Sequence, residues 1–147
     1  MSKNPLPKSR NTGMIAKLKI LIVEDDAVLA KMAKELLAEA GCETSIVHTG
    51  RAGIELASEK KFDLFALDIG LPDMTGFDLC RDLKQRHLSH RTPVVFISGQ
   101  PSDEHKQRGL ELGAADFISK PFDVAKFVPR LLSHVKTNSV APLKSAI

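Results

Sequence analysis

Tryptophan and tyrosine are absent from this chain of 147 residues, and its seven aromatic side chains are all phenylalanine. Phenylalanine carries no polar group, so these rings are expected mainly in the core. Stacking aromatics of the kind that bind single-stranded nucleic acid therefore have little support. Cysteine is also scarce. Cys42 and Cys80 form no CxxC or zinc pattern, and buried thiols in a reducing compartment are expected.

Long apolar runs and metal-ligand patterns are missing as well. No run approaches the roughly 18 residues of a membrane span, and residues 1–12 lack the apolar region of a signal peptide. A cytoplasmic protein that does not enter the membrane is predicted. His87 and His90 lie close together in a polar segment, where solvated side chains are expected rather than a metal site.

Positive charge is concentrated at the N-terminus. Five Lys and Arg residues precede Ile20 without any acidic residue among them, against a total net charge of +3, which leaves −2 for the rest. A basic excess confined to a tail forms no nucleic-acid-binding face, so no direct nucleic-acid contact is predicted. Residues 1–16 and 137–147 lack apolar periodicity. We expect them to be flexible tails around one folded domain at 17–136.

Short apolar runs alternate with helical patterns through this domain. Strands are expected at 19–23, 43–47, 64–67, 93–97 and 115–118. Helices are expected at 26–40 with Asp26 as cap, after a cap at Thr49, around 77–83, at 102–112, and at 123–135 with Asp123 as cap. This alternation predicts an α/β fold in which a parallel sheet has right-handed crossovers and helices on both faces.

Two of the expected helices have unusual compositions. The 102–112 helix is polar, has little apolar periodicity and contains Gly109, so it is expected to be weak and mobile. Pro129 lies within the last helix, where it removes a backbone hydrogen bond. It predicts either a bend or a helix that starts late, with Pro129 in its first turn.

Polar residues stand where four of the strands end. Glu24 and Asp25 follow the first, Asp68 the third, Ser98 the fourth and Lys120 the fifth. Each alone has an ordinary explanation, since acids also cap helices and occupy turns. Together they predict a site, because open α/β sheets place ligands at the carboxyl ends of their strands.

The chemistry of such a site follows from its charges. Three neighbouring carboxylates repel one another unless a cation or a proton intervenes, and they suit a hard divalent ion such as Mg²⁺. An aspartate can then attack phosphorus and form an acyl phosphate. Lys120 offers a point charge, and Ser98 a hydroxyl donor, to phosphoryl oxygens.

The segments that carry these residues resemble a two-component response regulator receiver domain. The matching segments are ILIVEDD at 20–26, LDIGLPDMTG at 67–76, VVFISG at 94–99 and AADFISKPF at 114–122. The resemblance implies a flavodoxin-like, doubly wound (βα)5 fold. It also implies a five-stranded parallel sheet in the order 2-1-3-4-5.

The resemblance also implies a role for each residue of the predicted site. It makes Asp68 the phosphoacceptor and Lys120 the lysine that acts with it. Glu24 and Asp25 become the metal-site acids, and Gly70 offers a backbone carbonyl to Mg²⁺ or Mn²⁺. A sensor histidine kinase or a histidine phosphotransfer protein is the implied donor. The chain is then no enzyme, apart from its own phosphorylation and autodephosphorylation.

Four residues are implied in the lifetime and relay of the signal. Ser98 is the switch hydroxyl and Phe117 the aromatic switch residue. Gly70 and Gln100 occupy the positions that tune phosphoryl lifetime. The phosphoryl group is expected to draw the Ser98 hydroxyl inward, so that Phe117 can rotate into the vacated space.

This switch is expected to remodel the face formed by the helix at 102–112, the last strand and the helix at 123–135. A homodimer through that face is one expectation. Asp116 and Lys126 could supply opposite charges across a symmetric contact. Apolar residues expected near the face are Phe122, Val124 and Phe127.

Other functions are considered beside this one. A dehalogenase-type phosphatase, which also uses Mg²⁺ and an Asp nucleophile, needs a second Asp where Gly70 stands. A flavin mononucleotide binder would have its phosphate repelled by the acids at 24–26. A degenerate receiver that acts only as a protein-interaction module is the remaining alternative. The chain is either a stand-alone receiver or the receiver part of a longer protein, and its pathway stays open.

Overall fold

One sheet of five strands, in the order β2-β1-β3-β4-β5, forms the centre of the protein, and each neighbouring pair of strands is parallel. This computed structural model describes residues 17–135, so the flexible tails predicted at 1–16 and 137–147 lie outside the described residues. The strands are β1 (Lys19–Val23), β2 (Glu43–Val47), β3 (Leu64–Asp68), β4 (Val94–Ser98) and β5 (Asp116–Ser119). The predicted flavodoxin-like α/β order is confirmed.

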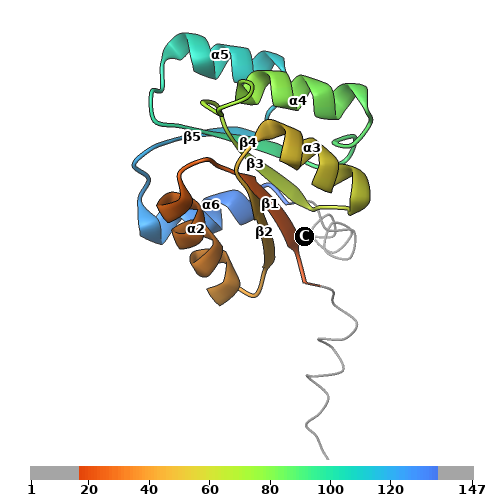
Figure 1. Cartoon of the computed structure of the whole chain (residues 1–147). Coiled ribbons are helices and arrows are strands. Elements are labelled where there is room, and N and C mark those ends of the chain that lie inside the picture. Colours follow the sequence, from red (N-terminus) through yellow and green to blue (C-terminus); the bar gives the residue numbers. More distant parts are fainter. Residues whose placement is uncertain (1–16, 136–147) are drawn as a thin grey trace, which may run out of the picture.

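Helices cover both faces of this sheet. The helices are α2 (Ala27–Glu39), α3 (Gly50–Glu59), α4 (Gly76–Gln85), α5 (Asp103–Glu111) and α6 (Val124–Leu132). Figure 1 shows α3, α4 and α5 on one side of the sheet and α2 and α6 on the other. Each helix of the described chain is too short or too polar to span a bilayer.

A polar side chain caps the N-terminus of every described helix. The predicted caps Asp26, Thr49 and Asp123 accept backbone N–H groups in the first turns of α2, α3 and α6. Thr75 and Ser102 do the same for α4 and α5. These bonds satisfy backbone donors that the helix itself leaves free, and they fix where each helix begins.

The core has two halves, one on each face of the sheet. Along β1, Leu21 and Val23 pack with α3 and α4, whereas Ile20 and Ile22 pack with α2 and α6. A strand covered on both faces has no solvent-facing side and therefore reads as a continuous apolar run. On β1, β3 and β4 the polar groups thus lie at or next to the strand ends, where the site lies, whereas β2 also carries Thr44 and Ser45 in its interior.

Helix α6 differs from the sequence-based prediction in where it begins relative to Pro129 and in where it ends. It begins at Val124, so Pro129 lies in its interior, and the late start is wrong. The Asp123 cap and the burial of Phe127 and Leu131 outweigh the backbone bond that proline removes. The helix ends at Leu132, before the expected residue 135.

Helix α5 rests on the sheet through a glycine. Gly109 is its one buried residue. A Cβ there would lie 3.1 Å from Phe96 Cδ2 and 3.5 Å from Phe117 Cδ2. The glycine therefore permits a close approach of the helix backbone to these rings, whereas the predicted weakness of the helix stays a prediction.

Candidate functional site: an acidic cluster at the carboxyl edge

Backbone hydrogen bonds continue past the ends of the strands and place the functional residues side by side. The N–H of Glu24 donates to the Val47 carbonyl at 3.0 Å, which prolongs the β1–β2 pairing. The N–H of Lys120 donates to the Ser98 carbonyl at 2.7 Å, which prolongs the β4–β5 pairing. The polar side chains predicted from four strand ends thus come from one rigid edge.

Three carboxylates meet at this edge. Each of Glu24, Asp25 and Asp68 offers an oxygen within 4.8 Å of the others. Glu24 and Asp68 are buried, with 3% and 5% of their surface exposed, whereas Asp25 is exposed. A set of carboxylate oxygens with one solvent-facing member suits Mg²⁺, which binds through few carboxylates and keeps several waters. The donor set therefore fits the predicted ion.

Lys120 joins the two buried acids. Its Nζ lies 2.8 Å from Glu24 Oε1 and 3.3 Å from Asp68 Oδ1. Burial opposes the charge of Lys120, but the hydrogen bond from its ammonium to Glu24 and the charges of Glu24 and Asp68 raise its pKa. The lysine is therefore held as a cation between the carboxylates.

Glu24 is the carboxyl group most affected by the cluster. Burial raises its pKa to about 7, and the hydrogen bonds from Lys120 and from the Asp26 N–H oppose this shift. The charge of Asp68 raises the pKa of Glu24 further. Without a divalent cation, Glu24 is thus close to the point at which it takes a proton.

The acids at 24–26 have different structural roles. Asp26 caps α2, where its Oδ1 accepts the N–H groups of Val28 and Leu29. Glu24 Oε2 instead accepts the Asp26 N–H at 3.1 Å. Helix capping therefore accounts for Asp26 alone and leaves Glu24 and Asp25 to the acidic cluster.

The two oxygens of Asp68 have different surroundings. Oδ1 lies 3.3 Å from Lys120 Nζ and accepts the Gly70 N–H at 3.3 Å. Within residues 17–135, Oδ2 has no hydrogen-bond partner from the protein. One oxygen is thus held in place while the other is free to react or bind.

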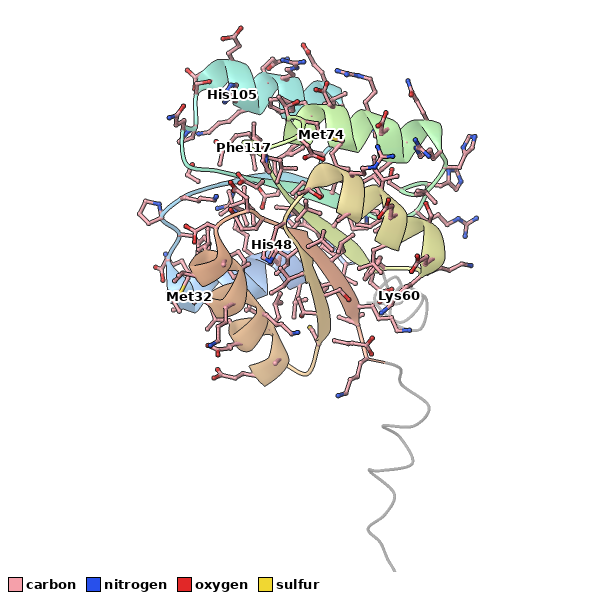
Figure 2. The ribbon with its side chains drawn as sticks, viewed as in Figure 1. Met32, His48, Lys60, Met74, His105 and Phe117 are labelled. Atoms are coloured by element: carbon pink, nitrogen blue, oxygen red, sulfur yellow. The ribbon has the colours of Figure 1, made fainter. Side chains whose placement is uncertain are left out.

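The remaining predicted residues differ in their burial and in their contacts. Ser98 is buried, and its Oγ accepts the Gln100 N–H at 3.1 Å. Gln100 and Gly70 are exposed at the rim. Phe117 lies outside the acidic cluster: its ring centroid is 6.5 Å from that of Phe96, on the side of the sheet that α5 covers (Figure 2).

Two residues near the site had not been predicted. The Asp73 carboxylate accepts the Gly50 and Arg51 N–H groups, at 2.8 and 2.9 Å, and ties the loop after β3 to the start of α3. Desolvation opposes the shift, but these bonds lower the pKa of the exposed Asp73. A Cβ at Gly76 would collide with the Asp68 carbonyl oxygen. Sequence spacing carries no signal for either contact, because both are long-range or steric.

His48 also contacts the site from β2. Its Nδ1 lies 2.8 Å from the Glu24 carbonyl oxygen, and Figure 2 shows the ring beyond the end of β2. An N–H there donates to that carbonyl and fixes the backbone between the two metal-site candidates. This contact was not predicted from the sequence, because His48 belongs to no recognisable metal-ligand pattern.

Fold and site together define a flavodoxin-like α/β domain with a lysine-paired acidic cluster at its carboxyl edge. Residues 20–132 match the family described as the response regulator receiver domain. Response regulator ArlR of Staphylococcus epidermidis is 36% identical over 112 residues, which are 76% of this chain and 50% of that protein. Probable transcriptional regulatory protein SilR of Salmonella typhimurium is 40% identical over 114 residues, 78% of this chain and 49% of that protein.

Solved structures agree with these relatives. Chemotaxis protein CheY4 of Vibrio cholerae superposes with a TM-score of 0.77 and 29% identity, covering 82% of this chain and 100% of that one. The BeF3-activated N-terminal receiver domain of Klebsiella pneumoniae RstA gives a TM-score of 0.74 and 32% identity, covering 81% and 99%. The chain belongs to the response regulator receiver domain family. It spans about half the length of the curated relatives named above.

The raised pKa of Glu24 predicts a pH dependence of stability in the absence of divalent cations. Between the ordinary value of 4.5 and about 7, the folded protein keeps a proton that the unfolded chain has lost. The contribution of Glu24 to stability is therefore greatest at low pH and is lost as the pH rises through this window. Relative to Glu24→Gln, the wild type should lose roughly 2 kcal/mol between pH 5 and pH 8.

Urea unfolding of both proteins with a chelator present measures this difference. Titrating groups that do not contact Glu24 cancel in the comparison. Glu35→Gln, an exposed position on α2, controls for the loss of one negative charge. A wild-type-to-variant difference that stays constant from pH 5 to pH 8 contradicts the assignment.

Proposed function

We propose that this chain is a phosphorylation-dependent signalling domain, with residues 17–136 as the receiver unit, in which Asp68 accepts a phosphoryl group. The donor would be a cognate histidine kinase or a histidine phosphotransfer protein, as expected for a response regulator. The observation that carries the proposal is the Asp68 carboxylate. It is buried beside two acids, with Oδ1 held by Lys120 and Gly70.

The proposed step is an in-line displacement. Asp68 Oδ2 attacks phosphorus, and a new O–P bond forms as the P–N bond to the donor imidazole breaks. The electron pair of that bond stays on the imidazole nitrogen. Lys120 Nζ, already beside Asp68, offers a positive charge to the phosphoryl oxygens, and Ser98 offers its hydroxyl proton.

Glu24, Asp25 and Asp68 would hold the divalent cation, together with the backbone carbonyl of Gly70. The ion supplies neutralisation of the charge on the incoming phosphoryl group. Asp25 is the exposed acid of the three, and Glu24 is already paired with Lys120. We therefore assign Asp25 the direct contact and Glu24 the weaker one.

The alternatives have less support. A turnover phosphatase would need a second acid where this chain has Gly70. The phosphate of a flavin mononucleotide would be repelled by the acidic cluster. A degenerate receiver would lack members of the site, whereas Glu24, Asp25, Asp68 and Lys120 all converge at this edge. The only reaction that we propose for the chain itself is therefore its own phosphorylation and dephosphorylation, and Gly70 and Gln100 at the rim are placed to influence how long the phosphoryl group lasts.

With Mg²⁺ and acetyl phosphate, the protein should gain one phosphoryl group that is stable to acid and labile to hydroxylamine. Asp68→Asn should abolish this gain, because the amide oxygen is a poor nucleophile. Intact-protein mass spectrometry measures the modification.

Two further variants test the site around Asp68. Asp25→Asn should slow phosphorylation at least about tenfold, since a bound metal ion supplies several kcal/mol of charge stabilisation. Asp82→Asn on α4 is the matched control and should react like the wild type. Phosphorylation of Asp68→Asn to the wild-type extent would sink the assignment.

We further propose that the signal reaches the face formed by α5, β5 and α6, called here the α5–β5–α6 face. Gly109 places the α5 backbone against the rings of Phe96 and Phe117. A rotation of Phe117 toward Ser98 would remove one of the two rings on which α5 rests. Because α5 buries little else, it should respond more than any other helix.

Amide hydrogen exchange with and without beryllofluoride, a phosphoryl mimic, tests this relay. The largest changes are expected in α5, β5 and α6. Gly109→Ala should alter α5 exchange even without the mimic, because its Cβ meets Phe96. Largest changes in α2 instead would show that the relay is wrongly placed.

A homodimer through the α5–β5–α6 face is a second candidate, favoured by two exposed apolar side chains. Leu110 on α5 is 62% exposed and Val124 on α6 is 49% exposed. Phe127, expected near this face, is buried in the core, and the half-buried Phe122 stacks on it at 4.0 Å, so Leu110 and Val124 are the exposed apolar side chains of the face.

Asp116 was considered as a partner of Lys126 across a dimer contact, but in the structure its partners lie within its own chain. Its carboxylate is bound in a bidentate manner by Arg130, at 2.7 and 2.8 Å, and contacts His134 Nε2 at 2.9 Å. Burial opposes the shift, but these bonds and the Phe117 N–H lower the pKa of Asp116 to about 2. A dimer must therefore rely on the apolar pair or exchange this salt bridge.

Sedimentation of the protein with Mg²⁺ and beryllofluoride should reveal self-association at micromolar concentration. Leu110→Ser should weaken it, because a contact across this face would bury Leu110. Val28→Ser is the matched control, since Val28 is 81% exposed on α2, on the other side of the sheet. A protein that stays monomeric under all conditions would contradict the homodimer, and the face would then be expected to bind a different protein.

A further inference from the structure

A hollow lies at the amino end of the sheet, opposite the acidic cluster. Its volume is about 710 Å³, and it is bordered by the loop after α4, the start of β4, the turn before β5 and the end of α6. Figure 1 shows α4 ending, and β4 beginning, at the side of the sheet away from the connection between β4 and α5. None of the proposed phosphorylation residues lines this hollow.

The lining of this hollow, called here the basic hollow, is rich in cationic and imidazole groups. Lys84, His87, His90, Arg91 and His134 all border it, and within residues 17–135 no Asp or Glu does. A concave surface with donors of one charge sign concentrates ligands of the opposite sign. The basic hollow thus has the electrostatics of an anion site.

A buried hydroxyl without a partner is an independent observation at the same place. Ser89 lines the basic hollow and is 9% exposed. Its Oγ has no hydrogen-bond partner in the described part of the chain. Nearby Thr92, in contrast, donates to the Phe62 carbonyl at 3.0 Å. Buried polar groups are almost always paired, so the Ser89 hydroxyl is a donor in the wall of the basic hollow that a water or a ligand with acceptor atoms would satisfy.

Two basic groups are positioned by the backbone around them. His87 follows the end of α4 with φ of 60°, a left-handed conformation in which glycine is usual after a helix. The chain thus keeps an imidazole where glycine would fit more easily. The Lys84 ammonium donates to the Leu112 carbonyl, which anchors its charge at the turn before β5.

A metal site is the main alternative, since three histidines line the hollow. Among the described residues, the one group of His, Cys, Asp or Glu side chains close enough to share an ion is the acidic cluster at the other edge. His134 is moreover committed to Asp116 through Nε2. The histidines of the basic hollow therefore do not form a converging set of metal ligands.

We propose that the basic hollow binds a phosphate-bearing small anion, either inorganic phosphate or a phosphomonoester. Donors on several sides match the three terminal oxygens of a phosphoryl group better than the two of a carboxylate. The volume exceeds that of phosphate alone, and Pro93, Val94 and Ala115 add apolar wall. An ester with a small organic part would therefore fit as well.

Titration of the full chain with inorganic phosphate, followed by amide NMR, tests this proposal. Mg²⁺ is omitted, and chloride keeps the ionic strength constant. Saturable shifts are expected at Ser89, His90 and Gly113, and none around Asp68. An absence of saturation, or shifts confined to the Asp68 loop, would overturn the basic hollow as a phosphate site.

Matched substitutions separate specific binding from a general charge effect. Arg91→Gln should weaken phosphate binding at least about tenfold, as expected for a charged hydrogen-bond donor. Arg86→Gln removes the same charge from a neighbouring exposed position outside the hollow, and it should change affinity less than about twofold. Equal weakening by both substitutions would overturn the proposal.

Two further experiments test whether His87 takes part in binding and which anion is preferred. His87→Gly should remain folded by thermal unfolding, because glycine suits the left-handed position, yet bind phosphate more weakly. Retention of full affinity would remove His87 from the site. Glycerol phosphate binding more tightly than phosphate would identify the ester as ligand, and equal affinity would identify free phosphate. Equally tight binding of acetate would contradict the choice of a phosphoryl group.

Discussion

The attraction between one ammonium group and two buried carboxylates is the interaction on which the site depends. Glu24 and Asp68 lie at the ends of neighbouring strands, where their charges repel and water is largely excluded. Lys120 offsets this cost with contacts at 2.8 and 3.3 Å, although burial still raises the pKa of Glu24. A buried charge cluster of this kind is stable only with a matching cation. The charge of this cluster is therefore balanced by the Lys120 ammonium and is reduced further when Glu24 takes a proton.

The sheet explains why these charges can lie so close together. Helices cover both of its faces, so the central strands β1, β3 and β4 carry apolar side chains in their interiors, and their polar groups lie at the strand ends. Backbone bonds beyond β1 and β4 then hold Glu24 and Lys120 in register. The loop after β3 is fixed separately, by Asp73 on the N-terminus of α3. Stable core packing and a reactive edge thus follow from the same arrangement.

The two edges of the sheet have opposite character. Carboxylates converge at one edge, and basic side chains surround the hollow at the other. Between them, α5 rests on Phe96 and Phe117 through Gly109, and Arg130 ties α6 to β5 through Asp116. These contacts hold α5 and α6 on the sheet between the two edges. Because the chain spans about half the length of relatives such as ArlR, what lies downstream of this face belongs to the proposals above.

The sequence by itself determined the α/β alternation, the caps at Asp26, Thr49 and Asp123, and the polar strand ends, because each is a local pattern of periodicity or punctuation. The strand order and the individual roles came from resemblance to the receiver family. Tertiary structure alone decided that Asp26 caps while Glu24 pairs with Lys120, that Phe127 is buried, and that Asp116 is held by Arg130. It also assembled the hollow around Ser89 and Arg91. Spacing along a chain cannot reveal such contacts, because they join segments whose distance is set only when the helices pack onto the sheet.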